Sequence, residues 1–167
     1  MKSVNVVLAV LLALLFVSGC AQPQYEPLHI GDTAPQAMLS DLEGKHITVP
    51  GELKGQVVLI RFWSATCPHC TKEMINALET LYQKYREKRF AVVSVNVNPP
   101  NEVMDKFREA GKVSFLVLLD PDQVAAKRYG AQVLPATFIL DREGVVKEKM
   151  LGETGVEMLE PLVEQFL

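Results

Sequence analysis

Strand-like and helix-like patterns alternate along most of this chain, and the alternation limits the folds that it can adopt. Gln56–Trp63 is a run of β-branched and aromatic residues, typical of a strand buried on both faces. The next segment, Cys70–Lys88, carries apolar residues at spacings of three and four, which is the period of an amphipathic helix. The pattern continues to the end of the chain, with strands predicted at Phe90–Val97, Ser114–Leu119, Ala136–Leu140 and Val145–Met150 and helices at Glu102–Ala110, Asp122–Tyr129 and Gly155–Leu167. It predicts an α/β domain with a central mixed β-sheet flanked by helices.

Two turn signals predict hairpins near the ends of this domain. Asp141-Arg142-Glu143-Gly144 separates the last two predicted strands by a short polar segment that ends in glycine, as β-hairpin turns do. Near the start, the short β-like segments Ala37–Leu39 and His46–Val49 flank Asp41-Leu42-Glu43-Gly44. We therefore expect an N-terminal β-hairpin extension ahead of the alternating elements.

The first residues have the proportions of a targeting sequence. Lys2 gives a positive start, and Val4–Val17 is an apolar run interrupted only by Asn5. A helix needs about 20 apolar residues to span a bilayer, so this shorter run predicts a signal peptide. Val17-Ser18-Gly19-Cys20 resembles the bacterial lipobox, whose cysteine receives a diacylglycerol and becomes the mature N-terminus. The alternative is an ordinary secretory peptide that leaves Cys20 as a thiol.

These features divide the chain into three parts. Residues 1–19 are predicted to be a lipoprotein signal peptide, 20–29 a tether containing two prolines and two glutamines, and 30–167 a single domain. The formal net charge is −3 and no basic run occurs, so nucleic acid is not an expected partner.

The predicted chemistry lies where the first long strand meets the first helix. Cys67-Pro68-His69-Cys70 begins there, and a cysteine at a helix start is favoured as a thiolate by the helix dipole and unpaired N–H groups. The first thiolate can attack a substrate disulfide, and the second can resolve the mixed disulfide from one turn away. Cys67 is therefore the predicted nucleophile and Cys70 the predicted resolving thiol. A zinc site would need further ligands, and a purely structural bridge would close too small a loop to stabilise much. We expect no metal and no cofactor.

Several segments together resemble a known family. The active-site segment resembles that of thioredoxins, a later segment resembles their cis-proline loop, and the N-terminal motifs resemble the TlpA/ResA branch; they are Phe62–Cys70, Val133–Phe138, Gly31–Pro35 and Asp41–Lys45. The resemblance covers Ile30–Leu167 and implies a thioredoxin fold. It also implies that Pro135 is cis and faces the cysteines, and that the backbone beside it, at Leu134, pairs with the substrate.

Four further residues have predicted roles near the cysteines. The ResA resemblance implies that Glu73 lies close to them and tunes their acidity, although its spacing alone indicates a first-turn glutamate. His69, preceded by Pro68 as in DsbA-type oxidases, would favour the Cys67 thiolate and make the disulfide more oxidising. Trp63 is expected to pack beneath the site. Arg61 occupies the position of a buried aspartate in thioredoxins, and it either lies near the site or extends outwards.

The predicted function is that of a lipid-anchored thiol-disulfide oxidoreductase in the cell envelope, facing the periplasm or another extracytoplasmic space. The resemblance implies reduction of protein disulfides, with oxidised apocytochrome c as one substrate class and a membrane electron donor of the CcdA/DsbD type. We expect a monomer held to the membrane at Cys20. The alternatives are a DsbA-like disulfide donor that uses the same cysteine pair, a peroxiredoxin, and a copper-binding or chaperone module.

Overall fold

In the computed structural model, residues 25–68, 72–99, 105 and 112–167 are described. Within these residues the strands form one seven-stranded mixed sheet in the order β2-β1-β5-β4-β3-β6-β7. The strands are β1 (Ala37–Asp41), β2 (His46–Val49), β3 (Val57–Trp63), β4 (Phe90–Asn96), β5 (Leu116–Leu119), β6 (Ala136–Leu140) and β7 (Val146–Leu151). The helices are α2 (Lys72–Tyr85), α4 (Val124–Tyr129) and α5 (Val156–Phe166), with 3-10 turns η1 (Gly51–Leu53) and η2 (Arg86–Lys88).

The centre of the sheet is parallel and its edges are antiparallel. β3 pairs in parallel with β4, and β4 pairs in parallel with β5. β6 runs antiparallel to β3, and β7 runs antiparallel to β6. Every residue of β3 and β4 is buried, as expected of central strands covered on both faces. The α/β prediction with a central mixed sheet is therefore confirmed.

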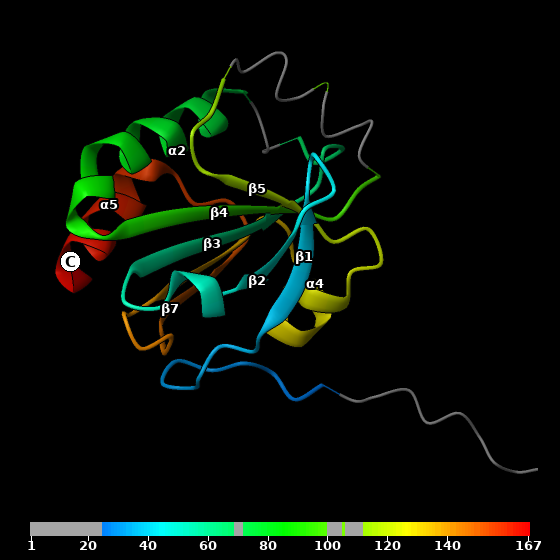
Figure 1. Cartoon of the computed structure of the whole chain (residues 1–167), viewed down its shortest axis with the longest axis horizontal. Helices are drawn as coiled ribbons and strands as arrows, with labels where there is room; N and C mark the ends of the chain where they lie inside the picture. The colour runs from blue at the N-terminus through cyan, green and yellow to red at the C-terminus, as the bar shows by residue number, and fades with distance from the viewer. Residues whose placement is uncertain (1–24, 69–71, 100–104, 106–111) are drawn as a thin grey trace, which may run out of the picture.

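Two apolar layers cover the two faces of the sheet. On one face, α2 and α5 lie side by side (Figure 1), and Leu78 and Leu81 of α2 pack in one cluster with Leu159 and Val163 of α5. On the other face, α4 and the N-terminal hairpin cover a second cluster that includes Phe62 and the other even-numbered residues of β3. Alternate side chains of β3 therefore fill both layers.

The N-terminal hairpin is present and is joined to the sheet. β1 pairs with β2, and its last two residues, Ser40 and Asp41, also pair with β5. The predicted strand Ala37–Leu39 thus extends by two residues, because its end finds a partner strand that is distant in sequence. In the turn, Asp41 Oδ1 accepts hydrogen bonds from the N–H groups of Glu43 and Lys45, 2.9 Å each.

Most predicted boundaries agree with the structure within a few residues. Ala136–Leu140 is a strand as predicted, whereas the predicted strand from Ser114 begins at Leu116. α2 ends at Tyr85, before the predicted Lys88, because the chain tightens into η2 and Arg89 takes a left-handed conformation. The predicted helix Glu102–Ala110 lies outside the described residues, as do residues 1–24 with the predicted signal peptide and Cys20.

The domain makes contacts just before its predicted start. Leu28 is buried in the second layer, and its carbonyl accepts a 2.8 Å hydrogen bond from Lys149 Nζ. Across the part of the chain that the structure describes, no helix has the length and apolar character needed to cross a bilayer.

Candidate active site

Cys67 lies on a short loop between the end of β3 and α2. Its side chain is half-buried, and it packs against the same apolar cluster as Met74 of α2. Its N–H donates a 3.0 Å hydrogen bond to the carbonyl of Ser64, which closes a turn just before the predicted nucleophile. His69 and Cys70, the other two predicted members of the motif, lie outside the described residues. Pro68 is exposed.

The loop before Cys67 is held by an asparagine from the neighbouring strand. Asn98 follows β4 by two residues, and its Oδ1 accepts hydrogen bonds from Ser64 Oγ and from the Ala65 N–H, 2.7 Å each. Asn98 was not among the predicted site residues. Its signal in the sequence is a pair of asparagines, Asn96 and Asn98, where an otherwise apolar strand ends.

The predicted cis-proline loop lies beside the same segment. The Leu134–Pro135 peptide bond is cis, which confirms that prediction. Ala136 pairs with Phe62 across the antiparallel β3 and β6, so Leu134 and Pro135 lie next to the segment that follows Phe62. The Pro135 carbonyl accepts a 2.8 Å hydrogen bond from the Gly152 N–H. Leu134 is half-buried, and Val133 is 53% exposed.

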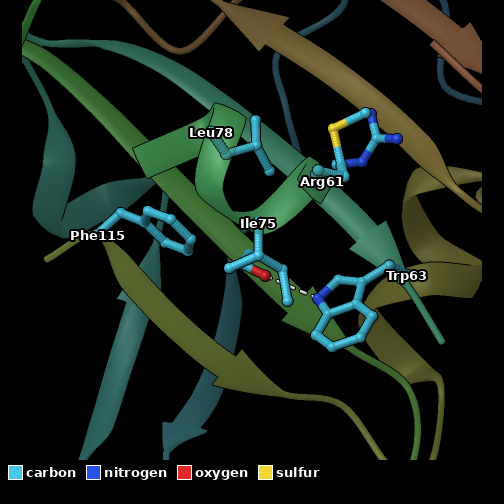
Figure 2. A pocket seen from close by; sticks show the side chains of 7 residues that line it. Arg61, Trp63, Ile75, Leu78 and Phe115 are labelled. Carbon is cyan, nitrogen blue, oxygen red and sulfur yellow. Dashed lines mark hydrogen bonds between the residues drawn. The ribbon is translucent and has the colours of Figure 1, made fainter. Parts of the chain in front are cut away.

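Trp63 forms part of the core beneath the loop, as predicted. The side chain is buried, and its Nε1–H donates a 2.7 Å hydrogen bond to Ser94 Oγ of β4. Figure 2 shows the indole beside Ile75, with the hydrogen bond to Ser94 as a dashed line. A buried indole N–H needs such a partner, and Ser94 supplies it.

Arg61 points inwards and does not extend into solvent. It is 2% exposed, and its Nη1 donates hydrogen bonds to Thr137 Oγ1 at 2.8 Å and to the Thr154 carbonyl at 3.4 Å. Together with Trp63 and Met74 it lines a small cavity between the sheet and α2 (Figure 2). A cation therefore lies next to Trp63 and Met74, in the layer against which Cys67 packs, and it is hydrogen-bonded to Thr137, two residues after the cis-proline. Because arginine stays protonated, it cannot act as a general base there.

Glu73 is exposed on the first turn of α2. It lines an open groove with Pro68, Met74 and Ala77 on one side and the segment around Glu153 and Val156 on the other. The groove thus adjoins the residue that follows Cys67. It contains apolar side chains between carboxylates.

The described residues contain no cluster of three or more histidine, cysteine, aspartate or glutamate side chains that could hold a metal ion. His46 Nδ1 contacts Ser40 Oγ at 3.1 Å on the N-terminal hairpin, and the backbone N–H of His29 donates to Asp32 Oδ2 at 2.7 Å. Both histidines thus have local partners of their own.

Comparisons with known proteins agree with this geometry. Residues 30–149 match the AhpC/TSA family. The thiol-disulfide oxidoreductase ResA of Bacillus thuringiensis (strain Al Hakam) is 35% identical over 135 residues, which cover 81% of this chain and 77% of ResA.

Two solved structures have the same fold. The thioredoxin domain of a thiol-disulfide oxidoreductase from Bacteroides vulgatus has a TM-score of 0.73 and 25% identity, covering 83% of this chain and 98% of that domain. StoA from Bacillus subtilis has a TM-score of 0.61 and 25% identity, covering 77% of this chain and 96% of StoA. With its thioredoxin fold and its cysteine beside a cis-proline, the chain belongs to the AhpC/TSA family and, within it, to the TlpA/ResA-like thiol-disulfide oxidoreductases.

Proposed function

We propose that this protein is a lipid-anchored extracytoplasmic reductase of protein disulfides that works through Cys67 and Cys70. The observation that carries the proposal is Cys67 itself, half-buried on a loop beside the cis-proline in a chain of this family. The C-x-x-C spacing supplies a second thiol to complete the reaction.

The proposed reaction transfers two electrons from the protein to the substrate. The Cys67 thiolate attacks one sulfur of the substrate disulfide, that S–S bond breaks, and the other substrate sulfur leaves and takes up a proton. The Cys70 thiolate then attacks the Cys67 sulfur, which forms the Cys67–Cys70 disulfide and releases the second substrate thiol. A separate donor must return two electrons before the next turnover.

The backbone before Pro135 is the proposed contact with the substrate chain. Gly152 already uses the Pro135 carbonyl, so pairing with an extended substrate segment falls to Leu134 and Val133. Val133 is largely exposed and directly precedes Leu134. A short added strand at this point would hold the substrate disulfide near the Cys67 sulfur.

The leader supports the proposed location. A short apolar run that ends in Val17-Ser18-Gly19-Cys20 is the basis for export and for lipid attachment at Cys20. We propose that the domain is a monomer held at the membrane surface and receives electrons from a CcdA/DsbD-type carrier. Oxidised apocytochrome c is the proposed substrate class, because of the similarity to ResA. A Cys20→Ser variant should no longer be found in the membrane fraction, because it lacks the lipid attachment site, and it should keep its disulfide reductase activity.

A disulfide donor of the DsbA type is the second candidate. The Pro68-His69 dipeptide is shared with DsbA-type oxidases, and a stabilised thiolate would make the disulfide more oxidising. Peroxidase activity is less well supported, because Trp63-Ser64-Ala65-Thr66 replaces the proline and threonine frame of peroxiredoxins. A peroxide-consumption assay separates that activity from disulfide exchange.

The first test is insulin reduction with single cysteine variants. Cys67→Ser should abolish the reaction, and Cys70→Ser should accumulate a mixed disulfide with the substrate that is visible on a non-reducing gel. Unchanged insulin reduction by Cys67→Ser would overturn the proposal.

The direction of electron flow is tested by the reduction potential of the pair. Potentials range from about −270 mV for thioredoxin to about −120 mV for DsbA. A value near the thioredoxin end supports a reductase, and one near the DsbA end assigns the protein as a disulfide donor.

A further inference from the structure

The loop that precedes Cys67 is held by side chains that are remote in sequence from the cysteine motif. Asn98 is half-buried, and its single carboxamide oxygen accepts two hydrogen bonds from the loop, one from the Ser64 hydroxyl and one from the Ala65 amide. Both donor–acceptor distances are 2.7 Å, which is the usual length for the Ser64 hydroxyl donor and the short end of the range for the Ala65 amide donor. One acceptor atom thus fixes both the side chain and the backbone of the loop.

Ser64 connects Asn98 to the residues next to Cys67 through further hydrogen bonds. Its hydroxyl donates to Asn98, so its two lone pairs are left to accept the Thr66 N–H at 3.3 Å and the Thr66 hydroxyl at 2.8 Å. Its carbonyl accepts the Cys67 N–H at 3.0 Å. Every donor and acceptor of the Ser64 side chain is therefore used to hold the residues between β3 and the nucleophile.

Asn98 is itself attached to the middle of the sheet. Its N–H donates a 2.7 Å hydrogen bond to Oδ1 of Asn96, which is fully buried at the end of β4. The Asn96 carbonyl accepts the Asp120 N–H at 2.8 Å, and the Val97 N–H donates to the Trp63 carbonyl at 3.1 Å. These hydrogen bonds attach the loop to the central strands of the sheet.

We infer that Asn98 is a positioning residue for disulfide exchange, holding the Ser64–Thr66 loop so that the Cys67 sulfur keeps one orientation beside Leu134 and Pro135. This inference rests on the proposed role of Cys67 as the nucleophile. Thiol-disulfide exchange requires the attacking sulfur to align with the substrate S–S bond, and small misplacements of a reacting group cost up to about 100-fold in rate. The residue acts through the loop and touches neither substrate nor reacting sulfur.

The test is the single-turnover oxidation of the reduced full-length chain by insulin, followed through the fluorescence of Trp63, the only tryptophan. Asn98→Leu keeps the approximate volume and removes the acceptor, and it should lower the limiting rate about 10-fold or more with little change in the insulin concentration for half-saturation. Asn98→Asp keeps an acceptor oxygen for both donors and should restore most of the limiting rate. Asn76→Leu removes an exposed asparagine of α2 and is the matched control, expected to react as the unmodified chain does.

A double-mutant cycle tests whether Ser64 and Asn98 act as one unit. Ser64→Ala should slow the limiting rate less than Asn98→Leu does, because the Ala65 N–H keeps its acceptor. The double variant should lose less than the two single losses combined, since both substitutions remove the same Ser64–Asn98 hydrogen bond. If Asn98→Leu does not fold, the comparison of Ser64→Ala and Asn98→Asp with the unmodified chain replaces it. Additive losses in the cycle would overturn the inference.

Two failures are distinguishable. If Cys67→Ser still reduces insulin disulfides at the normal rate, the proposed function fails and Asn98 has no reaction to serve. If Cys67→Ser is inactive while folded Asn98→Leu matches Asn76→Leu, only the positioning role fails. Equal losses for Asn98→Leu and Asn98→Asp would likewise contradict a role as hydrogen-bond acceptor.

Discussion

Arg61 is a charged side chain in a position where the sheet is otherwise apolar. It connects β3 to Thr137 of β6 and to the carbonyl of Thr154 in the segment before α5. These contacts give Nη1 of the buried guanidinium two oxygen acceptors. They also hold a positive charge beside Trp63 and Met74, on the side of the sheet where Cys67 packs.

We predict that Arg61→Leu lowers the reduction potential of the cysteine pair. Loss of the cation disfavours the thiolate and hence the reduced form, by an amount on the order of 30 mV, equivalent to about 1.4 kcal/mol. Arg61→Lys keeps the charge and should remain closer to the original potential. Glutathione titration of both variants checks this, and equal potentials in Arg61→Leu and the unmodified protein would exclude an electrostatic role.

At the scale of single elements, α4 depends on a carboxylate outside the helix. Asp120 accepts hydrogen bonds from the N–H groups of Ala125 at 3.2 Å and Ala126 at 2.8 Å. Burial raises the pKa of Asp120, and the hydrogen bonds from the Ala126 and Ala125 amides oppose that rise. The side chain therefore satisfies two N–H groups at the helix start at the expense of its own hydration.

We predict that Asp120→Ala destabilises the domain by about 1–2 kcal/mol, because two helix-start N–H groups lose their acceptor. Asp122→Ala is the matched control on an exposed neighbour and should change the free energy of unfolding by less than about 0.5 kcal/mol. Urea unfolding measures both. A loss of the same size in the two variants would show that capping is not the cause.

One face of the N-terminal hairpin is buried in the core, and the other face is exposed to solvent. Ile47 of β2 is 7% exposed in the second layer, whereas Met38 of β1 is 71% exposed on the outer side. We predict that Ile47→Ala lowers the free energy of unfolding by about 2–4 kcal/mol, the range for deleting a buried aliphatic side chain. Met38→Ala should have an effect within about 0.5 kcal/mol. Thermal and urea unfolding of both variants test whether the hairpin is part of the cooperative domain.

At the scale of the whole molecule, α2 and α5 are joined by a polar cluster at the edge of their shared apolar layer. Lys84 of α2 donates a hydrogen bond to Glu160 of α5, and the single hydroxyl proton of Tyr85 is shared between Glu160 and Glu164. The hydrogen bonds from Lys84 and then Tyr85 lower the pKa of Glu160 below its ordinary value. The Glu160 carboxylate in turn raises the pKa of Lys84.

These shifts predict an acid-dependent loss of stability. A carboxylate whose pKa is lower in the folded state contributes stability above its unfolded pKa of about 4.3, and this is lost as the pH falls through the folded pKa. Glu160→Gln should therefore flatten the acid side of the stability profile. Glu143→Gln, at an exposed turn carboxylate, is the control. Unfolding measured between about pH 2 and 7 checks the prediction, and an unchanged acid slope in Glu160→Gln would contradict it.

Local patterns in the amino-acid sequence were enough to predict individual strands and turns and the chemistry where the first long strand meets the first helix. Hydrophobic period, turn residues and the C-x-x-C spacing are local signals, so they predicted the strand Ala136–Leu140, the hairpin turn at Asp141–Gly144 and a cysteine after β3. The likeness of Val133–Phe138 to a known loop also predicted the cis peptide at Pro135.

The residues that reach the cysteine loop from distant parts of the chain could be found only in the folded protein. The contact from Ser64 to Asn98 spans 34 residues, and that from Arg61 to Thr137 spans 76. Likewise, β1 extends to Asp41 only because β5 lies beside it. These hydrogen bonds depend on the order and register of the strands. Packing between segments that are distant in sequence sets both, so local sequence patterns cannot predict them.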